Sequence, residues 1–251
     1  MSKFVLKGTR LFVNAVDLTS VNNKVELMAE VDEQESTAFN PDSATEVWRE
    51  VLGGIISSKC SAEGQWEAGD PGKVDDAAWA ALGAIGPVTI CPVGGPVAAG
   101  DLAYLTTMLA GDYQIGDQVG NVAPWSLDAT GSSPLVRGAA LHPPGTARTS
   151  TGNGTAVQLG ALAADQALYV NLHVLSASGT TPSITVKVQS DDNSGMTSPT
   201  DRATFTAATT RDAQTAKIVG AITDDYWRIA WTISGTGPSF LVIVSAGIGP
   251  A

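Results

Sequence analysis

Apolar and charged residues alternate along residues 24–32. The apolar positions are Val25, Leu27, Ala29 and Val31, and the charged ones are Lys24, Glu26, Glu30 and Asp32, with Met28 as the exception. A period of two residues predicts a strand with one buried face and one face in water. Residues 45–51 repeat the pattern less regularly, with Glu46 and Glu50 on the polar side. We predict that the two segments pair. Because like charges that face each other destabilise a sheet, the acidic surface they would form calls for a functional explanation.

The connection between these segments, residues 34–44, is polar and long, and it contains the turn sequence Asn40-Pro41-Asp42. Hairpin connections usually have about two to five residues, so a polar loop of this length favours a function. We predict that the loop reaches a neighbouring subunit. The residues assigned to this contact are Glu35, Phe39, Asn40 and Asp42.

The rest of residues 1–142 predicts short strands and one helix. Strands are expected near the N-terminus and at residues 55–63, 88–93, 101–109, 118–127 and 135–141. Residues 75–83 predict the helix, because acidic residues occupy its first turn, alanines fill its middle and Gly83 follows its end. Ala78, Trp79 and Leu82 are expected on its apolar side, with Trp79 in the core.

Residues 155–251 predict a second all-β unit. Alternating segments at 168–174, 184–189, 226–233 and 240–244 are separated by turn sequences. A repeat of about ten residues is typical of a β-sandwich of jelly-roll or immunoglobulin-like kind. Residues 143–154, rich in Pro, Gly, Ser and Thr, are expected to be the linker. The predicted fold is therefore all-β, with a sandwich or barrel and one short flanking helix in residues 1–142, followed by a second β-sandwich.

The net charge of −11 is concentrated in the first unit. Residues 1–142 hold 18 acidic and 8 basic side chains, whereas residues 143–251 hold 7 and 6. This asymmetry favours two units with different tasks. It argues against a protein that grips nucleic acid, because binding phosphates requires clustered Lys and Arg.

The expected compartment follows from the N-terminus and the cysteines. The N-terminus has no apolar run of the kind found in signal peptides, and no segment approaches the length of a membrane span. Cys60 and Cys91 are therefore expected to be reduced and buried. We expect the chain to fold in the cytoplasm, with no membrane partner.

Residues with catalytic or metal-binding chemistry are few and scattered. His142 lies at the linker and His173 on the polar side of a strand, and both are expected to be ordinary surface or half-buried histidines. Residues 191–195 resemble a fragment of a calcium loop but lack its spaced ligands and distal Glu, so a polar turn is expected. Neither cysteine has a partner at metal-ligand spacing. We predict no enzymatic activity, no cofactor and no metal.

Trp227 and Trp231 lie four residues apart on one predicted strand and therefore share a face. Large rings that fill a sandwich core are the favoured interpretation. The alternative is a stacking platform for sugar, which would make the chain a carbohydrate-binding module on a virion or cell surface. An enzyme with a β-sandwich appendage ranks third.

Short runs in both units carry a resemblance to a known family. They are WREVLGG at residues 48–54, Ser57-Ser58, EGQWEAG at 63–69, the helix with Trp79, VQLG at 157–160, VQSDD at 188–192, WRIAW at 227–231 and SAGI at 245–248. Together, and in this order, they resemble the major tail protein, or tail tube protein, of long-tailed non-contractile bacteriophages. The resemblance implies subunits that join into six-fold rings through long hairpins, and rings that stack into the tube through which the genome is ejected.

The resemblance gives the acidic residues a use. We expect Glu26, Glu30, Asp32, Glu46 and Glu50 to face the channel of such a tube. Charges are screened over about 8–10 Å at physiological salt, so an acidic wall keeps passing DNA from adhering. The partners implied are other copies of the chain and the tape-measure, tail-terminator and distal tail proteins, with DNA only in transit. The implied location is the virion tail, and the host cytoplasm during assembly, with residues 155–251 on the outside of the tube.

Overall fold

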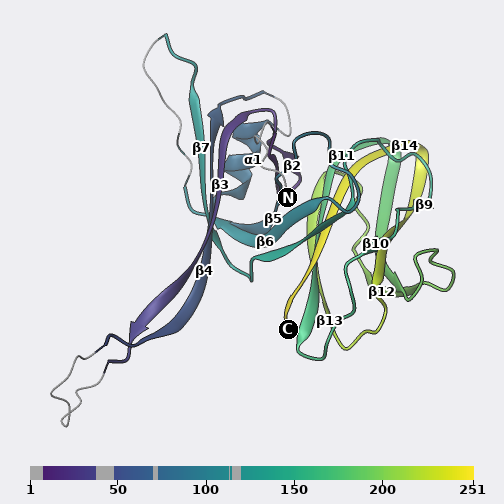
Figure 1. Cartoon of the computed structure of the whole chain (residues 1–251). Coiled ribbons are helices and arrows are strands. Elements are labelled where there is room, and N and C mark those ends of the chain that lie inside the picture. The colour runs from purple at the N-terminus through teal and green to yellow at the C-terminus, as the bar shows by residue number, and fades with distance from the viewer. Residues whose placement is uncertain (1–7, 38–47, 70–72, 113, 115–119) are drawn as a thin grey trace.

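The computed structural model describes residues 8–37, 48–69, 73–112, 114 and 120–251. These residues form a nearly all-β chain with one short helix, which confirms the predicted fold class (Figure 1). The elements in chain order are β1 (Arg10–Val13), β2 (Val16–Asp17), β3 (Asn22–Glu35), β4 (Val51–Gln65), α1 (Val74–Ala81), β5 (Ile85–Cys91), β6 (Leu102–Ala110), β7 (Pro124–Gly131), β8 (Val136–His142), β9 (Gly152–Asn153), β10 (Val157–Gln158), β11 (Gln166–Asp191), β12 (Thr200–Thr204), β13 (Asp212–Val219) and β14 (Tyr226–Pro250).

The N-terminal half is a curled antiparallel sheet in the order β3, β4, β7, β6, β5, β1. Alternate residues of these strands point into one apolar core. Its members include Leu11, Cys60, Ala62, Val88, Ile90, Met108, Trp125 and Leu127. Helix α1 covers this core through Val74 and Ala81. The curl of the sheet therefore places the helix and core on one face and leaves the other face free for different contacts.

Helix α1 packs with a different face from the predicted one. Val74, Ala78 and Ala81 are buried, whereas Trp79 is 67% exposed. Residues 74, 78 and 81 recur at intervals of four and three, which places them on one side of the helix, and Trp79 is turned about 100° from Ala78. The prediction that Trp79 belongs to the core is wrong. The small and β-branched residues face the sheet instead, and Gly83 (φ 74°) follows the helix end as predicted.

The C-terminal half is built from two long strands that pair along almost their whole length. β11 and β14 run antiparallel from the pair Gln166 and Pro250 to the pair Asp191 and Tyr226. Each contains two of the predicted strands. β13 extends the ribbon beside residues 167–174 and β12 beside residues 187–190, so the bent ribbon forms two layers. Trp227, Ile229, Phe240 and Val244 are among the buried residues between the layers.

Glycine allows the ribbon to bend between its two layers. Gly179 has φ 117° and Gly235 has φ 113°, a backbone conformation that other residues rarely adopt. A Cβ atom at Gly179 would lie 2.7 Å from the carbonyl oxygen of Gly237, so the two strands approach too closely there for a side chain. The turn sequences expected at these positions are therefore bends within continuous strands.

The two halves share one sheet and a buried junction. β8 pairs with β6 of the N-terminal half and with β14 of the C-terminal half. The amide nitrogen of Asn171 in β11 donates to the carbonyl oxygens of Val88 (3.0 Å) and Thr106 (3.1 Å). His173 bonds the hydroxyl of Thr89 through Nε2 (2.9 Å) and the backbone oxygen of Asn14 through Nδ1. These bonds hold the C-terminal half against β5 and β6.

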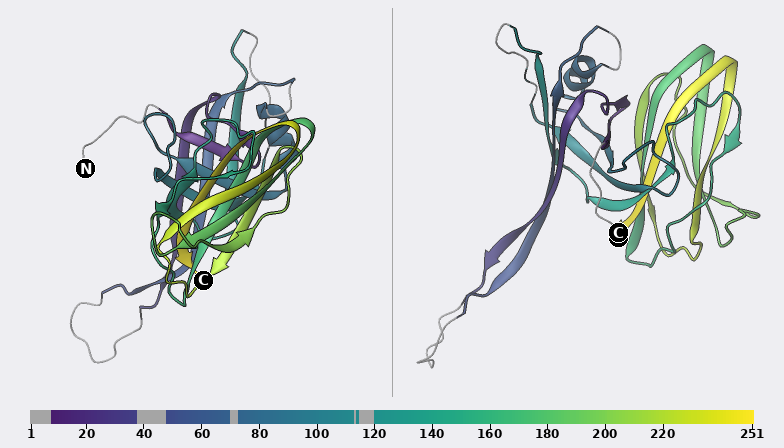
Figure 2. Two further views of the ribbon diagram at one scale, coloured as in Figure 1. Left: turned by 90° about the vertical axis from the view of Figure 1, so that its right-hand side faces the viewer. Right: turned by 45° about the horizontal axis from the view of Figure 1, so that its top comes forward.

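The sheet thus continues across the predicted linker. Figure 2 shows the C-terminal half as a stack of strands beside the N-terminal half, while β3 and β4 extend away from both. The division into residues 1–142, 143–154 and 155–251 stays a prediction about independently folding units. The two predicted units are in contact, because β8 ends at His142 inside the sheet that they share.

Both histidines lie in the interior, contrary to the prediction that they are surface or half-buried residues. His173 is on the side of β11 that faces β5, and Asn171, two residues before it, also bonds across the junction. Burial lowers the pKa of His173 to about 4. Burial, with a smaller effect of Arg148, lowers the pKa of His142 to about 4.

These pKa values predict a loss of stability in mild acid. In the unfolded chain a histidine titrates near a pKa of about 6.5. Above that pH both states are neutral, whereas between about pH 6.5 and 4 only the unfolded state takes up the protons, so the free energy of unfolding falls. Urea titrations of the monomer at pH 7, 6 and 5 should show this decline. The variant His173→Gln should be less stable at pH 7 but decline less steeply.

The matched variant is His142→Gln. It should remove the part of the fall in the free energy of unfolding that protonation of His142 causes. Equal slopes for the original protein and for both variants would contradict the assignment of the acid sensitivity to these buried imidazoles.

Candidate functional site

β3 pairs with β4, from Asn22 opposite Gly64 to Glu35 opposite Val51. The register joins Lys24 to Glu63, Glu26 to Ser61, Met28 to Lys59 and Glu30 to Ser57. Residues 24–31 thus have their partners in residues 56–63, so the prediction that they pair with residues 45–51 is wrong. Residues 55–63, expected to be a separate strand, are part of β4 and provide this partner. Glu26 and Glu30 consequently face serines, which avoids the expected repulsion between strands.

The two faces of the β3–β4–β7 sheet have opposite character. On one face, Val25, Ala62 and Leu127 lie in a row across the three strands and contribute to the core. On the other face, the same register places Glu26, Ser61 and Asp128 in a row. Because side chains alternate between faces, each row of the core has a row in water beside it. We call the second one the acidic face.

The acidic face carries three of the five carboxylates that the sequence assigned to a channel. Glu26, Glu30 and Asp32 occupy alternate positions of β3 and are exposed. Glu50 is exposed just before β4 begins, and its backbone oxygen accepts the N–H of Ser36 (2.9 Å). Glu46 lies outside the described residues. The structure thus brings the β3 residues onto one surface but does not place Glu50 in the same strand.

The acidic face has two further carboxylates that the sequence pattern did not predict. Glu63 in β4 is 3.1 Å from the ammonium of Lys24, and Asp128 in β7 is exposed beside Ser61. The hydrogen bond to Glu63, with the nearby charge of Glu26, raises the pKa of Lys24. Trp125, Leu127 and Ala129 alternate with polar residues in 124–131, and this alternation predicts a strand with Asp128 on its polar face. The strand was expected to end at residue 127.

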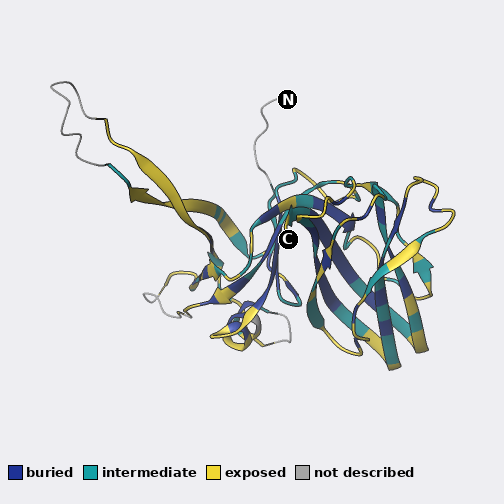
Figure 3. Cartoon of the chain, turned by 90° about the horizontal axis from the view of Figure 1, so that it is seen from below, coloured by how far each residue is buried: buried dark blue, intermediate teal, exposed yellow. Residues whose placement is uncertain are grey.

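The outer parts of β3 and β4 form a two-stranded arm that projects from the body of the protein. We define the arm as residues 30–36 and 50–57, and Figure 3 shows its ribbon exposed along both strands. Its apolar side chains lie in solvent: Ile55 is 77% exposed and Ile56 73%, with Val31, Val51 and Leu52 also exposed. An isolated two-stranded ribbon is marginally stable in water. A projecting ribbon with several exposed aliphatic side chains is typical of a surface that a partner covers.

The loop residues assigned to a subunit contact fall mostly beyond the described part of the arm. Glu35 is the last residue of β3, and its carboxylate lies 3.8 Å from Nε of Arg49. Glu33 lies 3.9 Å from the same guanidinium. These distances are near the limit for an ion pair, and all three side chains are exposed, so the pairs contribute little to stability. Phe39, Asn40 and Asp42 lie outside the described residues.

Strand edges on both sides of this sheet are open within the described residues. β3 pairs with β4 on one side and with no other described strand. β7 pairs with β4 along its length, but with β6 only from Ala129 to Gly131. The unpaired edge of β3 and the first part of β7 therefore present free backbone donors and acceptors, which readily pair with another chain.

Three other features bear on function in the described residues: possible metal ligands, the two cysteines and the helix. No group of three or more His, Cys, Asp or Glu side chains among these residues is placed to hold a metal ion. Burial raises the pKa of both Cys60 and Cys91 to about 12, so both are inert thiols. Among the helices of that part of the chain, none is long and apolar enough to cross a membrane.

The tryptophans proposed as an alternative sugar platform lie inside the C-terminal sandwich. Trp227 is fully buried and Trp231 nearly so. Their indole N–H groups donate to the backbone oxygens of Gly160 (2.9 Å) and Ser150 (2.9 Å). Satisfied and buried rings cannot stack on a sugar, so the core interpretation of these two residues is confirmed.

Comparisons with known proteins give structural neighbours of low identity. No family model matches the chain, and no curated protein matches it. Among solved structures, the chain is similar to a protein of the virion of a native gene transfer agent particle, with 13% identity, a TM-score of 0.42, and coverage of 53% of this chain and 97% of that one. A second is the tail of an empty gene transfer agent particle with C6 symmetry, at 14% identity, a TM-score of 0.37, and coverage of 50% and 92%.

A third similar structure is the Dit protein of phage SPP1, described as a paradigm of the hub adsorption apparatus of phages that infect Gram-positive bacteria. It has 11% identity and a TM-score of 0.35, and the match covers 96% of this chain and 99% of that one. The chain is thus similar in structure to tail components of phages and gene transfer agents.

The arm predicts a gradient of hydrogen exchange along β4. Residues 59–65 are flanked by β3 and β7, whereas residues 51–56 have only β3 beside them and solvent on both faces. Local opening of the arm exposes few buried contacts, so its amides should exchange faster in the monomer than those of residues 59–65. Mass spectrometry of peptides after deuterium labelling measures both. The β11–β14 pair is the internal reference for slow exchange, and protection of the arm equal to that reference in a monomer would contradict an unsupported arm.

Proposed function

We propose that this protein is a structural component of a virion tail, which assembles as six-fold rings that stack into a tail tube with an acidic channel. The observation that carries the proposal is the β3–β4 ribbon, which has one unpaired edge, a solvent-exposed apolar arm and a carboxylate-bearing face. These features are unfavourable or marginal in a monomer. A closed assembly of identical subunits uses all three.

Ring closure follows from the open edges. In the proposed ring, the free edge of β3 pairs with the free edge of β7 in the next copy, which joins the β3–β4–β7 sheets into one barrel. Closure removes the exposed edges that otherwise favour uncontrolled aggregation. Self-association through different surfaces on each copy closes into a ring when the rotation between copies allows it.

The arm provides the energy of assembly. Complete burial of one Ile, Leu or Val side chain stabilises by about 1.5–3 kcal/mol. Ile55, Ile56 and Leu52 are mostly in solvent, so covering them with a neighbouring subunit contributes substantially at each contact. Burial in the assembly also explains why a solvated arm retains aliphatic residues.

The acidic face explains the charge of the N-terminal half. With the core and α1 on one side of the sheet, the side chains of Glu26, Glu30 and Asp128 are left for the channel of the proposed barrel. Carboxylates repel phosphates at short range and are screened at longer range. The wall therefore lets DNA pass without binding it, and low adhesion is the proposed contribution of the protein to genome ejection.

The competing functions are less well supported. A carbohydrate-binding module depended on Trp227 and Trp231, which are buried. An enzyme would need a cluster of catalytic side chains, whereas both histidines have structural partners in the core.

Removal of the apolar surface of the arm should block assembly while leaving the monomer folded. In the double variant Ile55→Ser with Ile56→Ser, both changes affect exposed side chains, so the monomer's free energy of unfolding should change by less than about 0.5 kcal/mol per site. Electron microscopy of the concentrated unmodified protein should show rings and tubes, and the variant should stay monomeric. The control Val219→Ser, at an exposed apolar residue of β13, should assemble normally.

Each outcome discriminates between functions. Tubes from the double variant would contradict the role of the arm. Rings of unmodified protein that never stack would favour a ring-shaped hub over a tube, and absence of any ring or tube would contradict the proposed function itself.

Reversal of one charge on the acidic face should make the tubes bind DNA. Asp128→Lys places one cation per subunit at the centre of the proposed channel wall, and Asp165→Lys makes the same change at an exposed position of the C-terminal half. Tubes of the first variant should retain short double-stranded DNA in a salt-dependent way, whereas tubes of the unmodified protein and of Asp165→Lys should not. Equal retention by both variants would show that Asp128 does not line the channel.

A further inference from the structure

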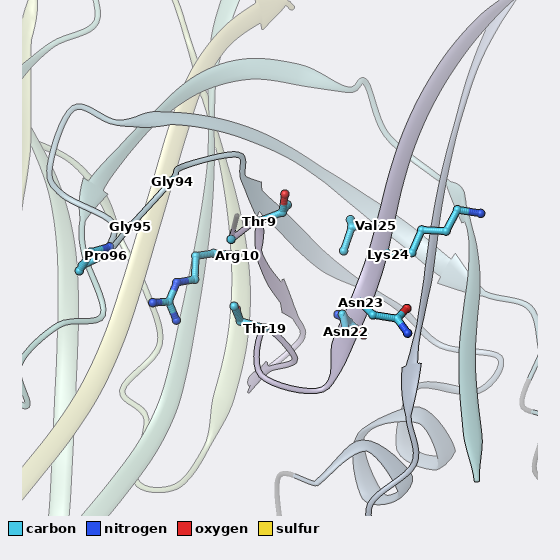
Figure 4. A pocket seen from close by; sticks show the side chains of 11 residues that line it. Thr9, Arg10, Thr19, Asn22, Asn23, Lys24, Val25, Gly94, Gly95 and Pro96 are labelled. Atoms are coloured by element: carbon cyan, nitrogen blue, oxygen red, sulfur yellow. The ribbon is translucent and has the colours of Figure 1, made fainter. Parts of the chain in front are cut away.

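A groove at the start of β3 is lined by glycines together with polar and basic residues. It has a volume of about 600 Å³ and is lined by residues 8–10, Thr19, residues 22–25 and residues 94–96 (Figure 4). The lining contains Arg10 and Lys24 but, among the described residues, no Asp or Glu. In a chain with 25 acidic and 14 basic residues, a basic groove without carboxylates is suited to an anionic ligand.

Arg10 is the cation of this groove that remains available. Lys24 already lies 3.1 Å from Glu63 and 3.4 Å from Glu26. Arg10 is half-buried, and within the described part of the chain no carboxylate lies within ion-pair distance of it. Arginine binds carboxylates with two parallel N–H donors, so an unpaired guanidinium in a groove selects for a carboxylate partner.

A second residue of the groove lining, Asn22, also lacks partners. The side-chain amide of Asn22 has its nitrogen and its oxygen buried with no hydrogen-bond partner among the described residues. An unpaired buried amide is unfavourable. Because Asn22 lines the groove, its amide offers one donor group and one acceptor to the N–H and C=O of an extended backbone. Together, Arg10 and Asn22 fit an extended peptide that carries a carboxylate.

The arm is an extended segment that carries carboxylates, and it lies at the opposite end of β3 from the groove. Glu33 and Glu35 lie at the end of β3, and the nearest described cation, Arg49, holds them only at 3.9 and 3.8 Å. The arm is extended, thin and exposed on both faces. β3 has 14 residues, which span roughly 45 Å at about 3.3 Å per residue. If two copies are offset along β3 by the length of this strand, the groove of one copy lies at the end of the arm of the other.

We propose that the groove between β1, the start of β3 and residues 94–96 receives the acidic end of the β3–β4 arm of a second copy, with Arg10 bound to Glu33 or Glu35. This contact rests on the proposed function and specifies how rings stack. It joins different surfaces of the two copies and repeats without closing, which generates an open filament. Ring closure through the edges of β3 and β7 is a separate contact.

Charge reversal on each side tests the contact. Arg10→Glu alone and the pair Glu33→Lys with Glu35→Lys alone should each form rings that do not stack, with the concentration needed for tubes raised more than about tenfold. An equimolar mixture of the two variants should form tubes again, because each variant's arm matches the other's groove. The matched control is Arg211→Glu, which reverses an exposed arginine of the C-terminal half and should stack like the unmodified protein.

The outcomes separate this inference from the proposed function. If the unmodified protein forms neither rings nor tubes, the proposed function fails. If it forms tubes and Arg10→Glu forms them equally well, the function stands and the groove contact is overturned. If both variants stop at rings and their mixture does not stack, the pairing of Arg10 with the arm is overturned. Restored tubes in the mixture also show that both variants are folded.

Discussion

The pairing of β3 with β4 on one side only is the constraint on which the rest of the molecule depends. Side chains alternate along a strand, so the register of this pair decides at once which residues enter the core and which reach water. With Leu27 opposite Cys60, the apolar set lies over the core beneath α1, and the carboxylates lie on the other face. A slip by one residue would expose Val25 and Leu27 and bury Glu26. The acidic face is therefore as firmly specified as the core.

The same pairing leaves unused hydrogen-bonding capacity. β4 has strands on both sides over residues 59–65, whereas β3 keeps an open edge and the arm extends beyond the support of β7. A lone folded domain usually blunts such an edge with a bulge, a proline or a covering loop. Here a shift in register between Val31 and Glu33 bends the arm but leaves the edge open. The edge and the exposed isoleucines together make a second copy of the chain the simplest partner.

Much of the fold could be predicted from local patterns. The alternation of apolar and polar residues predicted β3 and the four segments of β11 and β14. Acidic residues followed by alanines predicted α1. The partner of β3 could not be predicted this way, because strand pairing depends on contacts between residues far apart in the sequence. Trp79 shows a related limit. Its helical spacing allowed two apolar sides, and the close packing of Val74, Ala78 and Ala81 on the sheet decided between them.

The histidines show why polar residues on a strand are ambiguous. The polar side of β11 was expected to face solvent, but β5 and β6 cover it, and Asn171 and His173 find partners in backbone and hydroxyl groups there. The residues of the acidic face have the same alternation and no such cover. The sequence pattern alone could not distinguish these two cases, since the difference lies in which half of the molecule packs on which strand.

For the acidic face, the decisive observation is its position in the assembled state. A cryo-electron microscopy reconstruction of the polymer formed by the unmodified protein measures it directly. The account predicts rings in which the edge of β3 is hydrogen-bonded to β7 of the next copy, with Glu26 and Asp128 directed into the channel. A polymer in which the edge of β3 remains in solvent and these carboxylates lie on the outer surface would contradict it.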